Sequence, residues 1–194
     1  MEPVRAFIAI ELPEPVRAAL ARLQDGLKAS RTTSVKWVDP EGVHLTIKFL
    51  GNIDAGEIPE LSKVLREAVK GTVPFRLKLE NAGAFPNIRA PRVVWVGVGG
   101  ETEHLLTLHK KVEQALAPLG FAPENRAFSP HLTLGRVREG AQANELRRLG
   151  EGIAASKAEG ESFFDVDSLN LMRSQLTREG AIYSCLASFK LNGD

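Results

Sequence analysis

Residues 43–51 read Val-His-Leu-Thr-Ile-Lys-Phe-Leu-Gly, and polar and apolar side chains alternate along this stretch from His44 to Phe49. Successive side chains of a β-strand point to opposite faces, so strict alternation predicts a half-buried strand. The two faces are Leu45, Ile47 and Phe49 toward the core, and His44, Thr46 and Lys48 away from it. An imidazole and a hydroxyl two residues apart would therefore project from the same side of the strand.

The same pattern returns once, as His131-Leu132-Thr133-Leu134, at an offset of 87 residues. This offset also places Phe7 on Val94 and the first amphipathic helix on the third. Internal similarity at a fixed offset indicates duplication of a structural unit. We therefore expect one bilobal domain over residues 1–194, with lobe one at about 1–88, lobe two at about 89–194, and room for the terminal strands to exchange between lobes.

The segments between these landmarks predict further strands and helices. Stretches typical of strands cover residues 4–10, 35–38, 75–79, 93–98, 163–171 and 182–191. Apolar residues at helical spacing predict helices around residues 16–27, 58–68, 105–116 and 146–153. Turn formers gather at Gly83–Pro91, the best candidate boundary between lobes. We expect an α+β fold of two similar lobes related by a pseudo-two-fold axis, each a mostly antiparallel sheet with helices on the outer face.

The composition excludes several classes of protein. Of the 194 residues, 43% are hydrophobic and 25% charged, which excludes a disordered or collagen-like chain. A net charge of +1 gives no global basic field for long nucleic acid, although a short RNA end or a small nucleotide still fits. No apolar run approaches the roughly 20 residues of a membrane span, and the single Cys185 cannot form an intrachain disulfide. We expect a cytoplasmic monomer with no membrane partner.

The two His-x-Thr pairs suit chemistry at phosphorus. Two lobes related by a two-fold axis can line one central cleft with a pair on each wall. Transfer at phosphorus needs a base for the attacking oxygen and an acid for the leaving one, and two imidazoles with pKa values of about 6.5 can hold those opposite protonation states near neutral pH. Threonine hydroxyls can donate to the non-bridging phosphate oxygens. The pattern favours a phosphodiester substrate, whereas two distant histidines without a third ligand argue against a metal site.

Several blocks of the chain resemble the two-histidine phosphoesterases, and among them the RNA 2′,3′-cyclic phosphodiesterases, also called 2′-5′ RNA ligases. The blocks are Phe7–Ile10, Lys36–Glu41, His44–Gly51, Pro130–Arg136 and Gly180–Tyr183. The resemblance implies a bilobal α+β fold with a central cleft, no metal or other cofactor, and opening of a 2′,3′-cyclic phosphate to a 2′-phosphate. The substrates would be RNA 3′ ends or small cyclic nucleotides.

The resemblance also implies roles for individual residues. His44 would be the proton donor to the leaving 3′-oxygen and His131 the proton acceptor from water, with Thr46 and Thr133 on the phosphate. Arg136 would be a phosphate contact, although strict alternation puts it on the core side unless a bulge or strand end near Gly135 turns it, or it lies at the rim.

Other candidate substrate contacts come from the residues themselves. Lys48 shares the His44 face, and Phe7, Phe85 and Tyr183 are candidate platforms for an unpaired base, with core packing as the alternative. Phe49 is expected in the core. Other functions stay open: 2′-5′ ligation or opening of other cyclic nucleotides at the same site, and a non-catalytic module that captures RNA ends. A near-symmetric cleft does not decide which histidine is the acid.

Overall fold

The computed structural model describes residues 3–29, 34–156, 163–178 and 180–193, and their strands form two antiparallel sheets. The four-stranded sheet has the order β3 (His44–Asp54), β1 (Pro3–Glu11), β8 (Ser168–Leu176), β9 (Ala181–Lys190). The five-stranded sheet has the order β2 (Val35–Trp37), β6 (His131–Val137), β5 (Val93–Gly100), β4 (Phe75–Phe85), β7 (Phe163–Val166). The predicted antiparallel pairing is confirmed.

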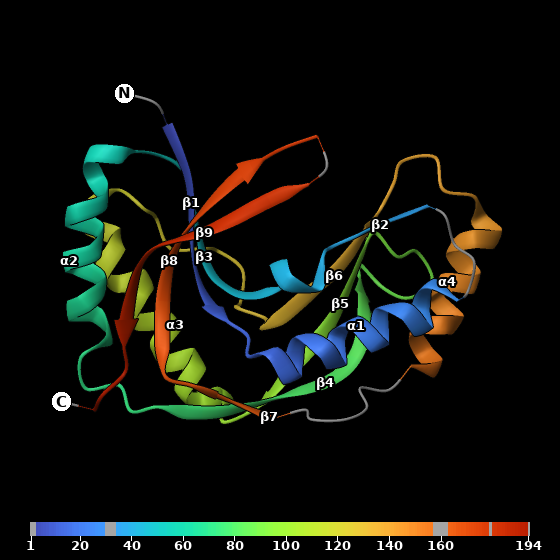
Figure 1. Cartoon of the computed structure of the whole chain (residues 1–194), viewed down its shortest axis with the longest axis horizontal. Coiled ribbons are helices and arrows are strands. Elements are labelled where there is room, and N and C mark those ends of the chain that lie inside the picture. The colour runs from blue at the N-terminus through green and yellow to red at the C-terminus, as the bar shows by residue number, and fades with distance from the viewer. Residues whose placement is uncertain (1–2, 30–33, 157–162, 179, 194) are drawn as a thin grey trace.

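The helices form two pairs at opposite ends of the molecule, one pair for each sheet (Figure 1). Helices α2 (Ile58–Val69) and α3 (Thr102–Leu116) pack together against the four-stranded sheet, and α1 (Glu14–Lys28) and α4 (Ala143–Ala155) against the five-stranded one. The amide of Gln24 on α1, for example, donates to the carbonyl of Leu134 on β6 at 3.0 Å. The predicted α+β fold with helices on the outer faces is confirmed.

The two sheets do not follow the two halves of the sequence. Strands β8 and β9, from the second half, join β1 and β3, whereas β2 and β4, from the first half, join the five-stranded sheet. The exchange therefore involves more than the terminal strands, and a division near residue 88 does not separate the sheets. One continuous buried cluster includes residues from Val4 to Leu191. That residues 1–194 behave as a single domain stays a prediction.

Two predicted boundaries were wrong for a tertiary reason. Strand β4 continues to Phe85, so the first three residues of the turn-rich segment Gly83–Pro91 belong to a strand that pairs with β5. The expected strand over 163–171 is two strands in different sheets, since β7 pairs with β4 and β8 pairs with β1. The chain passes between the sheets at Asp167.

A β-bulge occurs at equivalent positions in the two histidine strands. Ala9 lies opposite Thr46 but Ile8 lies opposite Lys48, which leaves Ile47 as an extra residue in β3. In β6, Trp95 lies opposite Thr133 but Val94 lies opposite Gly135, so that Leu134 is the extra residue. An extra residue inverts the alternation beyond it. Lys48 and Phe49 after the first bulge, and Gly135 and Arg136 after the second, therefore face the opposite way from strict alternation.

Candidate active site

His44 and His131 begin strands β3 and β6, and each ring is oriented by its own chain. The Nδ1 atom of His44 lies 2.8 Å from the carbonyl oxygen of Gly42, and Nδ1 of His131 lies 2.7 Å from that of Ser129. Because a carbonyl oxygen only accepts hydrogen bonds, Nδ1 carries the proton in both rings. The Nε2 atoms are thereby left to accept or donate a proton.

Aromatic rings surround each imidazole. The ring of Phe7 stacks on His44 with centroids 4.6 Å apart, and the ring of Tyr183 is edge-on to His44 with centroids 4.8 Å apart. The rings of Phe85 and Trp95 are edge-on to His131, with centroid distances of 5.1 and 6.4 Å. Such contacts restrict ring rotation beyond what the Nδ1 bond achieves. Both histidines are held in one orientation before substrate arrives.

The pKa of the His44 imidazole is lowered from its ordinary value of 6.5, chiefly because burial disfavours the charged ring. The hydrogen bond to the Gly42 carbonyl acts in the opposite direction, since it is stronger when the ring is protonated. In the free protein this ring is therefore mainly neutral near pH 7. A negative charge placed beside Nε2 would raise its pKa again.

The two threonines flank the histidines on the same strand faces. Thr46 and Thr133 are half-buried, and each precedes the bulge of its strand. Within the described ranges neither hydroxyl makes a hydrogen bond, so both are available as donors to a phosphate between the walls. Strands β3 and β6 then each present one imidazole and one hydroxyl.

Arg136 is turned out of the core by the bulge at Leu134 and is exposed. Burial raises the pKa of Tyr183, and the charges of Arg136 and Arg5 act more weakly in the opposite direction. Arg136 belongs to the five-stranded sheet and Tyr183 to the four-stranded one, so the guanidinium of one sheet acts on a side chain of the other. The Tyr183 hydroxyl stays protonated at neutral pH and can donate a hydrogen bond.

Two of the predicted substrate contacts were wrong. Lys48 is 3% exposed, because the bulge at Ile47 turns it under α3, where its ammonium group pairs with Glu113 at 2.8 Å. It also donates to the carbonyl of Ala122 at 2.9 Å. Phe7 is 2% exposed and packs with Ala9, so it supports His44 and presents no free face to a base.

Phe49 is the residue that the alternation rule misplaced in the core. The same bulge puts it on the His44 face of β3, where it is 61% exposed opposite Phe7. A bulge has no simple sequence signature, but the offset of 87 pairs Phe49 with Arg136, which the family resemblance had already placed toward substrate. That pairing could have found it.

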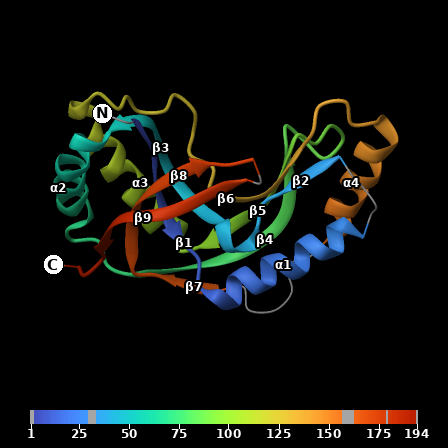
Figure 2. The same cartoon turned by 45° about the horizontal axis from the view of Figure 1, so that its top comes forward.

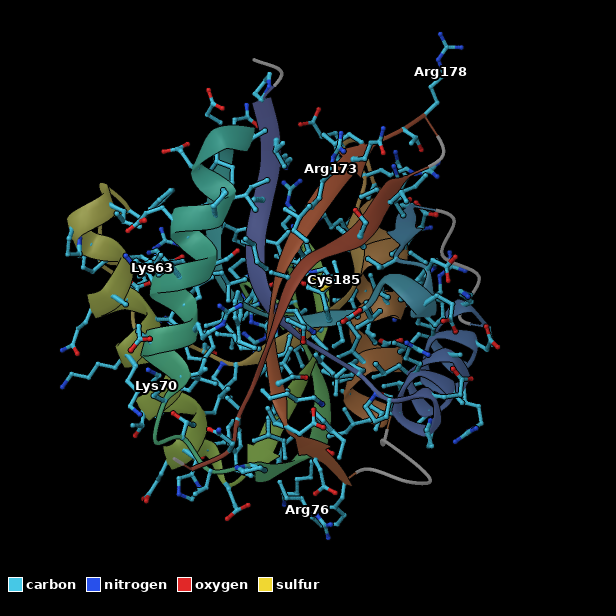
Figure 3. The ribbon with its side chains drawn as sticks, turned by 60° about the vertical axis from the view of Figure 1, so that its left-hand side comes forward. Lys63, Lys70, Arg76, Arg173, Arg178 and Cys185 are labelled. Atoms are coloured by element: carbon cyan, nitrogen blue, oxygen red, sulfur yellow. The ribbon has the colours of Figure 1, made fainter. Side chains whose placement is uncertain are left out.

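The described residues form neither a metal-binding cluster nor a membrane-spanning helix. Among them no three His, Cys, Asp or Glu side chains gather closely enough to hold a metal ion. None of their helices combines the length and apolar character that crossing a membrane requires. The single Cys185 is exposed on β9 (Figure 3).

The fold and site define a class of protein: two interleaved repeats, each presenting one histidine and one threonine from an equivalent strand, are the arrangement of a two-histidine phosphoesterase. The family described as LigT like Phosphoesterase matches the chain twice, over residues 10–95 and 96–183. The chain belongs to this family. The double match agrees with the predicted duplication.

Comparison with individual proteins gives similarity over nearly the full length. An RNA 2′,3′-cyclic phosphodiesterase of Methanothermobacter thermautotrophicus is 37% identical over 97% of this chain and 99% of the relative. An Aquifex aeolicus protein of the same name is 33% identical over 100% of both chains. The crystal structure of E. coli LigT complexed with 3′-AMP has a TM-score of 0.77 at 26% identity, covering 98% of this chain and 99% of that one.

Proposed function

We propose that this protein is an RNA 2′,3′-cyclic phosphodiesterase that hydrolyses a terminal 2′,3′-cyclic phosphate to a 2′-phosphate. The observation that carries the proposal is the pair of imidazoles, each with Nδ1 bonded to a backbone carbonyl and Nε2 left free for proton transfer. Relatives that match over nearly the full length carry this name.

In the proposed reaction a water molecule attacks phosphorus while Nε2 of His131 accepts its proton. The bond from phosphorus to the 3′-oxygen breaks, and Nε2–H of His44 donates a proton to that oxygen. The products are a 2′-phosphate and a free 3′-hydroxyl. Thr46 and Thr133 would donate to the non-bridging oxygens, and Arg136 would offset their charge.

Burial of His44 creates a requirement that the substrate itself can meet. The acid must be protonated, yet burial lowers the pKa of this ring in the free protein. The negative charge of a cyclic phosphate between the walls favours the imidazolium form and raises that pKa. Proton uptake by His44 would therefore accompany substrate binding, so that the acid is protonated when substrate is bound.

The hairpin of β8 and β9 supports an RNA end as the substrate. It extends past the sheet toward the side of β2, and its arginines include Arg173 on β8 and Arg178 near the tip (Figures 2 and 3). Such charges suit contacts with phosphates of a short single strand. We further propose that the enzyme acts in the cytoplasm as a monomer.

An end-group assay on short RNA bearing a 2′,3′-cyclic phosphate, run in EDTA, tests this function. Wild-type protein should form a 2′-phosphate, whereas His44→Ala and His131→Ala should each be about 10²- to 10⁴-fold slower. His104→Ala is the matched control, since this histidine lies on α3 with its side chain half exposed. An unchanged rate in either active-site variant would overturn the mechanism.

The same variants separate the roles and the alternatives. A substrate with an activated 3′ leaving group needs no acid, so it should restore turnover to His44→Ala and not to His131→Ala. Rescue of His131→Ala alone would reverse the assignment. Binding of the RNA end without turnover by the wild type would instead identify a non-catalytic capture module.

A further inference from the structure

We propose that His109 on α3 is a positioning residue for His131, the base of the proposed reaction. The His109 ring stacks on Phe128 and thereby fixes the backbone carbonyl that orients the His131 imidazole. This inference deepens the proposed function and rests on it. His109 is not itself a catalytic residue, because it acts on His131 only through the segment of chain that precedes β6.

The two active-site histidines differ in how the local backbone holds their carbonyl partners. Gly42, the partner of His44, ends a 3₁₀ turn whose first N–H groups are capped by a side chain. Ser129, the partner of His131, lies in an irregular segment over residues 121–130. Pairing of β6 with β5 begins only at His131, so the sheet does not hold Ser129. The Ser129 carbonyl therefore depends on contacts made by side chains.

Side chains from α3 and β3 hold this irregular segment at two places. Near its start, the ammonium group of Lys48, paired with Glu113, donates to the carbonyl of Ala122 at 2.9 Å. Near its end, the ring of Phe128 lies against that of His109, with centroids 4.1 Å apart and planes inclined by 8°. The ion pair and the aromatic stack are thus separate anchors for the two ends of the segment.

The aromatic stack is the anchor beside the carbonyl that matters for catalysis. Phe128 directly precedes Ser129, whose carbonyl oxygen lies 2.7 Å from Nδ1 of His131. The side chain of His109 is 15% exposed, and its pKa is lowered chiefly by burial, so the ring is mainly neutral near pH 7. A flat neutral ring parallel to Phe128 restricts the motion of that phenylalanine and of the backbone attached to it.

Displacement of the Ser129 carbonyl would change the protonation of His131. A neutral imidazole carries its proton on either nitrogen, and the hydrogen bond to the carbonyl selects Nδ1. Without that acceptor, part of the protein would carry the proton on Nε2, where it prevents transfer from water. Phe85 and Trp95 restrict rotation of the ring, but an aromatic edge does not select a tautomer. His109 should therefore affect kcat more than KM.

The test compares His109→Phe, which keeps a flat ring, with His109→Leu, which keeps apolar volume without one. On adenosine 2′,3′-cyclic phosphate, His109→Leu should lower kcat about 10- to 100-fold at unchanged KM, the loss expected when a reacting group is misplaced. His109→Phe should stay within a few-fold of wild type. His104→Ala is the matched control: this histidine is also on α3, but its side chain is 50% exposed and its ring lies 6.0 Å from that of Phe75.

A substrate with an activated 3′ leaving group shows which proton transfer is affected. It needs no acid, so it should restore turnover to His44→Ala and not to His109→Leu, whose defect lies in the base. Rescue of His109→Leu, or an equal loss of kcat in His109→Phe and His109→Leu, would overturn the assignment. Phe128→Leu removes the other ring of the stack and should behave as His109→Leu does, which keeps the test decisive if His109→Leu does not fold.

Nitrogen chemical shifts of the His131 ring, measured by NMR, test the positioning role without turnover. Wild type and His109→Phe should show the proton on Nδ1, whereas His109→Leu should show a mixture of the two tautomers. The same tautomer in all three proteins would overturn the role of His109. If the wild type does not turn over the substrate yet the tautomer depends on residue 109 in this way, the proposed hydrolysis fails and the positioning role stands.

Discussion

Replacement of Lys48 by methionine should destabilise the protein strongly and leave its chemistry nearly intact. The ammonium group of Lys48 is buried with Glu113, their side chains being 3% and 9% exposed and 2.8 Å apart. Methionine fills a similar volume without a charge. The carboxylate of Glu113 would then stay buried with only His109, whose Nε2 lies 3.7 Å from it and whose pKa is lowered by burial, and the Ala122 carbonyl would lose its donor.

The expected cost is about 3–5 kcal/mol, the usual penalty for removing one partner of a buried ion pair. In a protein of this size it corresponds to a Tm lower by about 6–20 °C. The backbone N–H of Glu124, 3.3 Å from the other Glu113 oxygen, cannot replace a cation. The double variant Lys48→Met with Glu113→Met removes both charges and should recover most of the lost stability, because a well-packed apolar pair often matches a buried ion pair.

Urea unfolding followed by circular dichroism measures these free energies. Lys70→Met is the matched control: its pair with Glu67 is also 2.8 Å long but 60% and 61% exposed, so its loss should cost no more than about 1 kcal/mol. At temperatures well below unfolding, Lys48→Met should retain kcat/KM within a few-fold of wild type. Equal costs for Lys48→Met and Lys70→Met, or a stable Lys48→Met protein with a greatly raised KM, would refute the structural role.

Three further outcomes follow from the site and its support. The pKa of the His44 ring, measured by NMR, should lie below 6.5 in the free protein and rise when adenosine 2′-phosphate binds, and an unshifted pKa would contradict the burial argument. Because the pKa is lowered in the folded protein, the unfolded chain takes up this proton first as pH drops. The free energy of unfolding should therefore fall as pH drops through 6.5, and it should fall more in wild type than in His44→Asn. Thr46→Val and Thr133→Val should each lower kcat/KM about 10- to 100-fold with unchanged unfolding midpoints, whereas unchanged kinetics would remove the hydroxyls from phosphate binding. Gly135→Ala should cost about 1–3 kcal/mol in urea unfolding, because its methyl group would lie 2.7 Å from Val35, and no loss would show that β2 adjusts freely.

Sequence periodicity was a good guide to the elements and a poor guide to their partners. The helical stripes and the alternating stretches located all four described helices and the histidine strands to within a few residues. The segment 163–171 reads as one strand, yet its two parts pair with β4 and with β1. The local sequence does not show which distant strand a segment will pair with, because strand pairing is set by burial of apolar side chains over the whole core.

For the site, the amino-acid sequence by itself determined that two His-x-Thr pairs project from equivalent strands, since alternation is a property of the local backbone. It could not determine the faces of Lys48, Phe49 and Arg136. Those depend on bulges, which arise where a strand must match the twist and length of its neighbour, and neighbours are set by tertiary packing. The histidines were thus predictable from the repeat, whereas the faces of Phe49 and Arg136 were decided by how β3 pairs with β1 and how β6 pairs with β5.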